Sequence, residues 1–188
     1  MWRVLPRLAV LNYFQILGLE PSFDLDVKTL EKSYFDLQRA AHPDRQLGKS
    51  EQERIVAIER SMDANEAYEA LKNPLTRAEH LLSLKGVHVN SEKDTVKPTQ
   101  ALLVEIMELR EQIADAEENG KKLLDLVSDI RKSADQTTDA IAEALHAEDL
   151  EYAAQHVIRL HYLGKAAEEA HMYLYRIKAA HAHTHESH

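Results

Sequence analysis

His42, Pro43 and Asp44 place an imidazole and a carboxylate two residues apart, on either side of a proline. Such a pair could carry out general acid–base catalysis if a pocket, a positioned substrate and further groups surrounded it. The chain offers no nucleophile motif, no glycine-rich phosphate loop and no HExxH zinc element to accompany the pair. We therefore predict that the chain is not an enzyme and has no catalytic residues, and that these side chains contact a partner.

The tripeptide follows a stretch of strongly helical sequence. Proline has no N–H to donate and restricts the residue before it, so a helix should end at about Ala41. We predict a short helix over residues 12–17 that ends at Gly18, and a second helix over residues 26–41. Residues 42–49 then form a loop that presents the tripeptide.

A second long helix should follow this loop. Ser50 and Glu53 have the spacing of a capping box, which begins a helix that ends near Lys72. The two long helices should therefore form an antiparallel pair with the tripeptide at its tip. Apolar spacing along them predicts these core positions: Leu30, Tyr34, Leu37, Ala41, Ile58, Met62, Ala67, Tyr68 and Leu71.

The rest of the chain also has helical patterns. Pro74 opens a further helix, and an irregular stretch with Gly86 and Pro98 follows it. Three long helical patterns joined by short connections then predict a three-helix bundle. The expected domain organisation is a first domain over residues 1–75, a connecting helix and linker over 76–98, the bundle over 99–180, and a disordered histidine-rich tail over 181–188.

Composition limits the classes of partner. The formal net charge of the 188 residues is −9, which disfavours nucleic acid, and no apolar run approaches the roughly 20 residues that span a membrane. We predict neither nucleic-acid nor membrane partners. Residues 1–10 carry two arginines and no acid but are short for a targeting signal, so we expect them to belong to the fold.

The charge is unevenly distributed along the chain. Cations outnumber carboxylates over residues 28–49, although the whole chain is acidic. A local basic face of this kind is suited to an acidic surface on a partner, and a merely solvated helix face produces the same pattern. Charge alone does not choose between these two interpretations.

Histidine is abundant and cysteine is absent. The absence of cysteine excludes disulfides and thiolate metal sites. Of the 11 histidines, four lie within residues 181–188, where they could bind a transition metal weakly or form a solvated tail. The other histidines do not show a spacing that is typical of metal ligands. We predict no resident metal site and no cofactor.

Three segments in a fixed order resemble a J domain, the module that stimulates the ATPase of DnaK-class chaperones. They are residues 12–19 (NYFQILGL), the tripeptide His42-Pro43-Asp44, and residues 65–74 (NEAYEALKNP). The resemblance covers roughly the first 75 residues. Arg45 follows the tripeptide where a lysine is more usual, which keeps the charge and changes the geometry of the donors.

Three later segments resemble the HscB family, J-type co-chaperones of iron–sulfur cluster assembly. They are residues 75–82 (LTRAEHLL), 103–111 (LVEIMELRE) and 157–163 (VIRLHYL). This resemblance extends from residue 12 to about residue 178. It implies an all-α, L-shaped protein in which a J domain precedes a C-terminal three-helix bundle. The chain lacks the cysteine module of some family members, which favours a bacterial, cytoplasmic form over one of the mitochondrial matrix.

The HscB resemblance implies two partners and two binding faces. An HscA-like or other DnaK-class ATPase would bind the J domain through His42, Pro43, Asp44, Arg45, Lys28, Lys32 and Arg39. An IscU-like scaffold protein would bind the bundle through Leu103, Val104, Met107, Glu108, Glu111, Asp115 and Tyr162. The chain would deliver the scaffold to the chaperone and stimulate its ATPase, for maturation of iron–sulfur proteins.

Other interpretations remain open. Periodicity alone favours a buried core role for Leu103, Met107 and Tyr162, whereas the resemblance favours an exposed binding patch. A J-domain co-chaperone with a different client would share the first domain. A helical adaptor with no chaperone role would need only the bundle.

Overall fold

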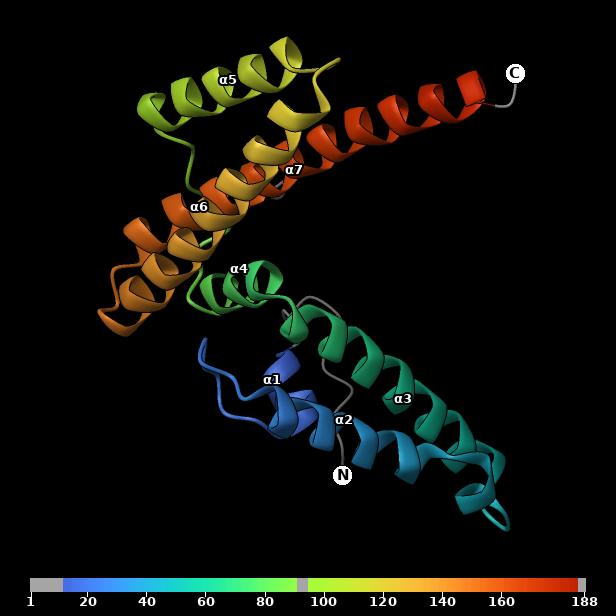
Figure 1. Cartoon of the computed structure of the whole chain (residues 1–188). Coiled ribbons are helices and arrows are strands. Elements are labelled where there is room, and N and C mark those ends of the chain that lie inside the picture. Colours follow the sequence, from blue (N-terminus) through green and yellow to red (C-terminus); the bar gives the residue numbers. More distant parts are fainter. Residues whose placement is uncertain (1–11, 91–94, 186–188) are drawn as a thin grey trace. The chain divides into compact units, whose positions relative to one another are not determined.

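A computed structural model describes residues 12–90 and 95–185, with side chains up to residue 180. Every regular element in these ranges is helical, which confirms the all-α prediction. The chain divides into two compact units, with the division between Val87 and His88 (Figure 1). In the described ranges, no helix is both long enough and apolar enough to cross a membrane.

The first unit contains α1 (Tyr13–Leu17), α2 (Val27–Ala41), the 3-10 helix η1 (Pro43–Gln46), α3 (Glu51–Lys72) and α4 (Pro74–Leu84). The predicted capping box is confirmed: the Glu53 N–H donates to Ser50 Oγ at 3.3 Å, and the Ser50 N–H donates to Glu53 Oε2 at 2.8 Å. Gly18 ends α1 at a φ of 66°, a left-handed conformation that suits glycine. Local signals thus set the ends of these helices.

The core of the first unit joins α1 to the α2–α3 pair. Its buried residues are Phe14, Leu17, Leu30, Ala64, Ala67 and Leu71. Two of our core predictions are wrong, because Ile58 and Met62 are 59% and 64% exposed. Ala64 and Leu71 set the buried face of α3, and a period of 3.6 residues turns Ile58 and Met62 away from it.

Arg77 ties α4 to the rest of the first unit. Its guanidinium is buried and donates to the carbonyl of Leu71 at 2.7 Å and to that of Phe23 at 2.6 Å. We had placed residues 76–98 in a connecting segment. The structure assigns α4 to the first unit because these bonds fasten it to the end of α3 and to the loop before α2.

His80 connects α4 to α1. Its Nε2 accepts a hydrogen bond from the backbone N–H of Tyr13 at 3.1 Å, and its ring lies 4.4 Å from the ring of Tyr13. Burial lowers the pKa of His80 from its ordinary value of 6.5. The imidazole is therefore held neutral, as an acceptor, in the folded chain.

This arrangement predicts a pH-dependent stability. A lowered pKa means that the unfolded chain binds the proton more readily, so the contribution of His80 is complete above pH 6.5 and falls as the pH drops toward the folded-state pKa. Denaturant unfolding at about pH 7.5 and about pH 5.5 should show the loss. His80→Gln keeps a neutral acceptor and should make the difference smaller; an equal pH dependence in both proteins contradicts this role.

The second unit contains α5 (Gln100–Asp115), α6 (Gly120–His146) and α7 (Leu150–His185). One hydrophobic core joins all three helices and includes Ile113 of α5, Leu123 of α6 and Leu163 of α7. The predicted bundle is therefore present. Helix α7 continues through residues 181–185, which we expected in a disordered tail, because alanines and the absence of proline and glycine there allow it. Residues 186–188 lie outside the described ranges.

Candidate functional site

The His42-Pro43-Asp44 tripeptide forms the start of η1, where we had predicted an irregular loop. His42 is the N-cap of this short helix, and its Nδ1 accepts a hydrogen bond from the backbone N–H of Asp44 at 3.3 Å. Nδ1 also lies 3.6 Å from Asp44 Oδ2. A ring whose Nδ1 is an acceptor carries its proton on Nε2, so Nε2–H is the donor that this exposed side chain offers.

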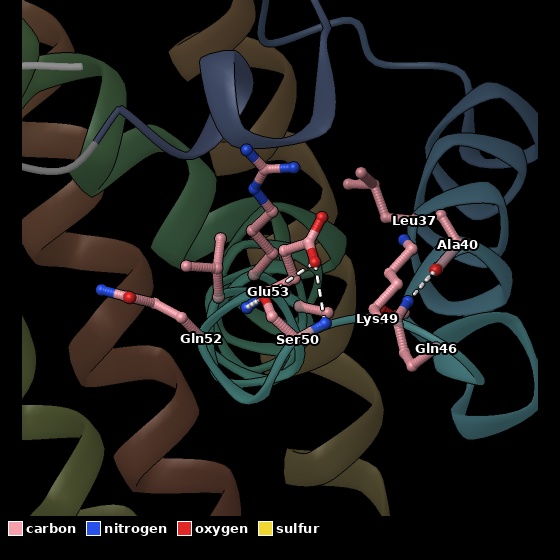
Figure 2. A pocket seen from close by; sticks show the side chains of 11 residues that line it. Leu37, Ala40, Gln46, Lys49, Ser50, Gln52 and Glu53 are labelled. Carbon is pink, nitrogen blue, oxygen red and sulfur yellow. Dashed lines mark hydrogen bonds between the residues drawn. The ribbon is translucent and has the colours of Figure 1, made fainter. Parts of the chain in front are cut away.

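Gln46 anchors this turn to α2. The Gln46 side chain is buried, and its Nε2 donates to the carbonyl of Ala40 at 2.8 Å. Figure 2 shows this bond, together with the capping box of Ser50 and Glu53 at the start of α3. The turn is thus held at both ends, while the side chains of His42 and Asp44 are 60% and 84% exposed. This geometry is suited to contact with a protein surface.

A basic face lies along the outer side of α2. Lys28, Lys32 and Arg39 are all exposed. Their spacing of i, i+4 and i+11 puts them on one side of the helix. Arg39 pairs with Asp36 one turn earlier, which orients its guanidinium. All three predicted cations of α2 therefore share a face that ends at the tripeptide, and Arg45 in η1 is exposed as well.

Phe35 also belongs to this basic face, and our sequence interpretation missed it. Its side chain is 54% exposed and stands seven residues after Lys28. An exposed aromatic ring among cations is typical of an anchor in a protein interface. A signal was present, because Phe35 falls outside the Leu30, Tyr34, Leu37 stripe of the same helix.

The second predicted set lies on one face of α5. Leu103, Val104 and Met107 are 42%, 48% and 62% exposed, and Glu108, Glu111 and Asp115 are exposed around and beyond them. The interpretation of Leu103 and Met107 as bundle core is therefore wrong. The core side of α5 is formed by Leu102, Leu109 and Ile113. The outer face combines apolar side chains with a carboxylate rim.

Tyr162 is half-buried on the side of α7 that meets α5. Arg159, three residues before it, binds Glu105 of α5 at 2.6 Å, and Glu169, seven residues after it, accepts from Arg110 of α5 at 3.3 Å. These spacings put all three α7 residues on one side. The two ion pairs bracket Tyr162 on α7 and Met107 on α5, so these residues lie at the same level of the bundle.

Arg159 fixes the orientation of α5, a role that our sequence interpretation missed. Its guanidinium donates to Glu105 of α5 and, on α6, to Ser133 at 2.9 Å and to the buried Thr137. Arg159 therefore links all three helices beneath the exposed patch. The available signal was a lone cation between apolar residues in the segment 157–163.

The basic face of α2 and the outer face of α5 are both exposed. Within the described residues, no group of three or more His, Asp or Glu side chains is placed to hold a metal ion. Both faces are open surfaces that combine apolar and charged side chains. Surfaces of this composition are typical of protein–protein recognition.

Comparisons with known proteins match both units. Residues 12–80 match the DnaJ domain family, and residues 98–171 match a family described as the HSCB C-terminal oligomerisation domain. Over 164 residues the chain is 36% identical to the co-chaperone protein HscB homolog of Shewanella loihica, covering 85% of this chain and 95% of that protein. It is 36% identical over 162 residues to co-chaperone protein HscB of Proteus mirabilis. That match covers 85% of this chain and 93% of the relative.

Two solved structures share the fold. Chaperone HscB from Vibrio cholerae aligns with a TM-score of 0.74 at 28% identity, over 88% of this chain and 99% of that one. The crystal structure of human co-chaperone protein HscB aligns with a TM-score of 0.75 at 29% identity. The alignment covers 85% of this chain and 80% of the human one. The predicted resemblance is therefore confirmed over both units.

Proposed function

The chain belongs to the HscB co-chaperone family, and on that premise we propose that it couples an IscU-like iron–sulfur scaffold protein to an HscA-like or other DnaK-class ATPase. It would bind the scaffold, deliver it to the chaperone and stimulate the chaperone's ATPase, in the cytoplasm of a bacterium. The observation that carries this proposal is the exposed His42-Pro43-Asp44 turn, which the Gln46–Ala40 hydrogen bond anchors at the end of α2.

In this proposal the turn acts by binding and not by chemistry of its own. A ligand shifts a conformational equilibrium only by its different affinity for the two states. The Nε2–H of His42 and the carboxylate of Asp44, both on exposed side chains, would contact the chaperone in the conformation that hydrolyses ATP. Pro43 fixes the backbone between them, so little conformational entropy is lost on binding.

The basic face of α2 would guide the chaperone to the turn. Lys28, Lys32 and Arg39 present positive charge on one side, which accelerates encounter with an acidic surface and weakens as salt is added. Phe35 sits among these cations and would supply apolar contact once the surfaces meet. We therefore add Phe35 to the proposed chaperone-binding residues.

The scaffold would bind the outer face of α5. Leu103 and Met107 provide an apolar centre, and Glu108, Glu111 and Asp115 provide an acidic rim. Such patches bind through a few central side chains, while the rim sets specificity. Tyr162 lies level with Met107 and extends the patch toward α7. The two proposed faces belong to separate compact units, so each can be altered without touching the other.

Phe35→Ala tests the chaperone-binding face. Loss of an exposed aromatic anchor should raise the concentration needed for half-maximal ATPase stimulation about tenfold, the equivalent of about 1.4 kcal/mol. Maximal stimulation should not change, because the turn is intact. Steady-state ATPase titrations measure both quantities. Val27→Ala, an exposed apolar residue elsewhere on α2, is the matched control. An unchanged titration for Phe35→Ala removes this residue from the face.

A further inference from the structure

The first half of α5 carries the centre of the proposed scaffold-binding patch but contributes little to the core of the second unit. The residues of α5 that join that core are Ile113 and, partly buried, Leu109, both in the second half of the helix. Between Gln100 and Met107 the buried side chain is that of Leu102. This sparse apolar packing indicates that other contacts position the start of α5.

Gln155 of α7 supplies such a contact. Its Oε1 accepts a hydrogen bond from the Thr99 N–H at 3.2 Å, and its Nε2 donates to the carbonyl of Lys97 at 2.8 Å. One partner requires an acceptor and the other a donor, so the two bonds fix the orientation of the amide. The amide thus pairs with the backbone on both sides of Pro98, which has no N–H of its own. This pairing clamps the segment that leads into α5 onto α7.

Thr99 transmits this constraint to the exposed patch. It is the N-cap of α5: its Oγ1 accepts from the Leu102 N–H at 3.2 Å, and its carbonyl accepts from the Leu103 N–H at 3.0 Å. The position of Thr99 therefore sets where the first turn of α5 lies. Leu103 closes that turn and Val104 follows it, so a displacement of Thr99 moves both side chains.

Arg159 continues the same attachment one turn further along α7. Gln155 and Arg159 have i, i+4 spacing, and Arg159 binds Glu105 of α5 at 2.6 Å. Both α7 side chains are half-buried, whereas Leu103 and Met107 are exposed. The polar atoms of the Gln155 side chain are bonded to the segment before α5. Gln155 is therefore placed to act on a bound partner through α5.

We propose that Gln155 is a positioning residue for the scaffold-binding face of α5. It holds the first turn of the helix in place, so that Leu103 and Val104 meet the scaffold without a rearrangement of α5. Preorganisation of this kind raises affinity because less ordering is left to occur on binding. The inference rests on the proposed scaffold-binding function and adds a residue outside the predicted binding set.

Two variants of Gln155 test the clamp. Gln155→Met keeps the length of the side chain and removes both hydrogen bonds, and Gln155→Ala removes the side chain. If the clamped arrangement falls to about one-tenth of the population, the affinity for an IscU-like scaffold falls about tenfold, as titration calorimetry measures. Hydrogen exchange of the Leu103 amide in the free chain should become severalfold faster. Far-ultraviolet circular dichroism should not change, because water can satisfy the exposed Thr99 N–H and Lys97 carbonyl.

Gln136→Met is the matched control, because Gln136 is an exposed glutamine of α6. This variant should change neither the affinity for the scaffold nor the exchange of the Leu103 amide. Stimulation of the ATPase without scaffold should be the same in all these variants, since the His42 turn belongs to the other unit.

A double-mutant cycle distinguishes positioning from direct contact. In a chain that already carries Leu103→Ala and Met107→Ala, Gln155→Met should reduce affinity much less than it does in the wild type. The reason is that the side chains it positions are then absent. Additive losses would mean that Gln155 contacts the scaffold itself, which overturns the positioning role.

The remaining outcomes separate this inference from the proposed function. Unchanged affinity in both Gln155 variants, with normal binding by the wild type, overturns the inference and leaves the proposed function standing. Faster exchange of the Leu103 amide without a loss of affinity also overturns it, because the clamp would then not serve binding. A wild-type chain that does not bind the scaffold overturns both.

Discussion

Replacing His42 by glutamine should abolish stimulation of the DnaK-class ATPase while binding of the scaffold protein stays unchanged. The reason is geometric: Nδ1 of His42 accepts from the Asp44 N–H, so Nε2–H is the donor of the ring that we propose contacts the chaperone. Glutamine has an amide N–H to donate, but it lacks the Nδ1 acceptor that caps η1 and the rigid ring that fixes the direction of the donor. Single-turnover ATP hydrolysis by the chaperone, with and without the variant, measures the effect.

A second variant distinguishes the role of His42 as the N-cap of η1 from its proposed contact with the chaperone. Asparagine is a good N-cap, so His42→Asn should preserve η1 and remove only the imidazole. It should be as inactive as His42→Gln. Full activity of His42→Asn would mean that His42 acts only by shaping the turn. Full activity of both variants would refute the J-domain role of the tripeptide in this chain.

Replacing both Leu103 and Met107 by alanine should weaken scaffold binding by about 2 to 4 kcal/mol in total, as truncation of interface hot spots does. Both side chains are exposed at the centre of the α5 patch, so their loss should leave the free energy of unfolding nearly unchanged. Titration calorimetry with an IscU-like scaffold measures the affinity, and denaturant unfolding checks the stability.

Leu124→Ala is the matched control, because Leu124 is equally exposed on α6 and lies outside the patch. It should bind the scaffold as the wild type does. The double variant should also retain its stimulation of the ATPase when no scaffold is present, since the His42 turn belongs to the other unit. Unchanged affinity of the double variant would remove the α5 face from the proposed function.

Local signals in the sequence were sufficient for much of the fold. The capping box of Ser50 and Glu53, the glycine after α1 and the proline after His42 each act through hydrogen bonds or backbone geometry within a few residues. Helix boundaries that depend on such signals were predicted closely. The end of α7 was not, because alanines after residue 178 permit a helix without requiring one.

The faces of the helices were harder to predict. Ile58 and Met62 fit an apolar stripe in sequence, but Ala64 and Leu71 pack against the other helices and turn that stripe outward. Leu103 and Met107 show the same ambiguity on α5, where Leu102 and Ile113 take the buried side. Periodicity indicates that a helix has an apolar face and does not say which of two faces is covered.

By itself, the sequence determined that the chain is helical, where most helices begin and end, and which ordered motifs mark it as an HscB-type protein, since these depend on neighbouring residues. The tertiary structure alone decided that His42 is exposed with its Nδ1 accepting from the Asp44 N–H, that Phe35 is exposed on the basic face, and that Arg159 binds Glu105 of α5. The physical reason is that exposure and ion pairing depend on residues distant in sequence, whose packing no local pattern records.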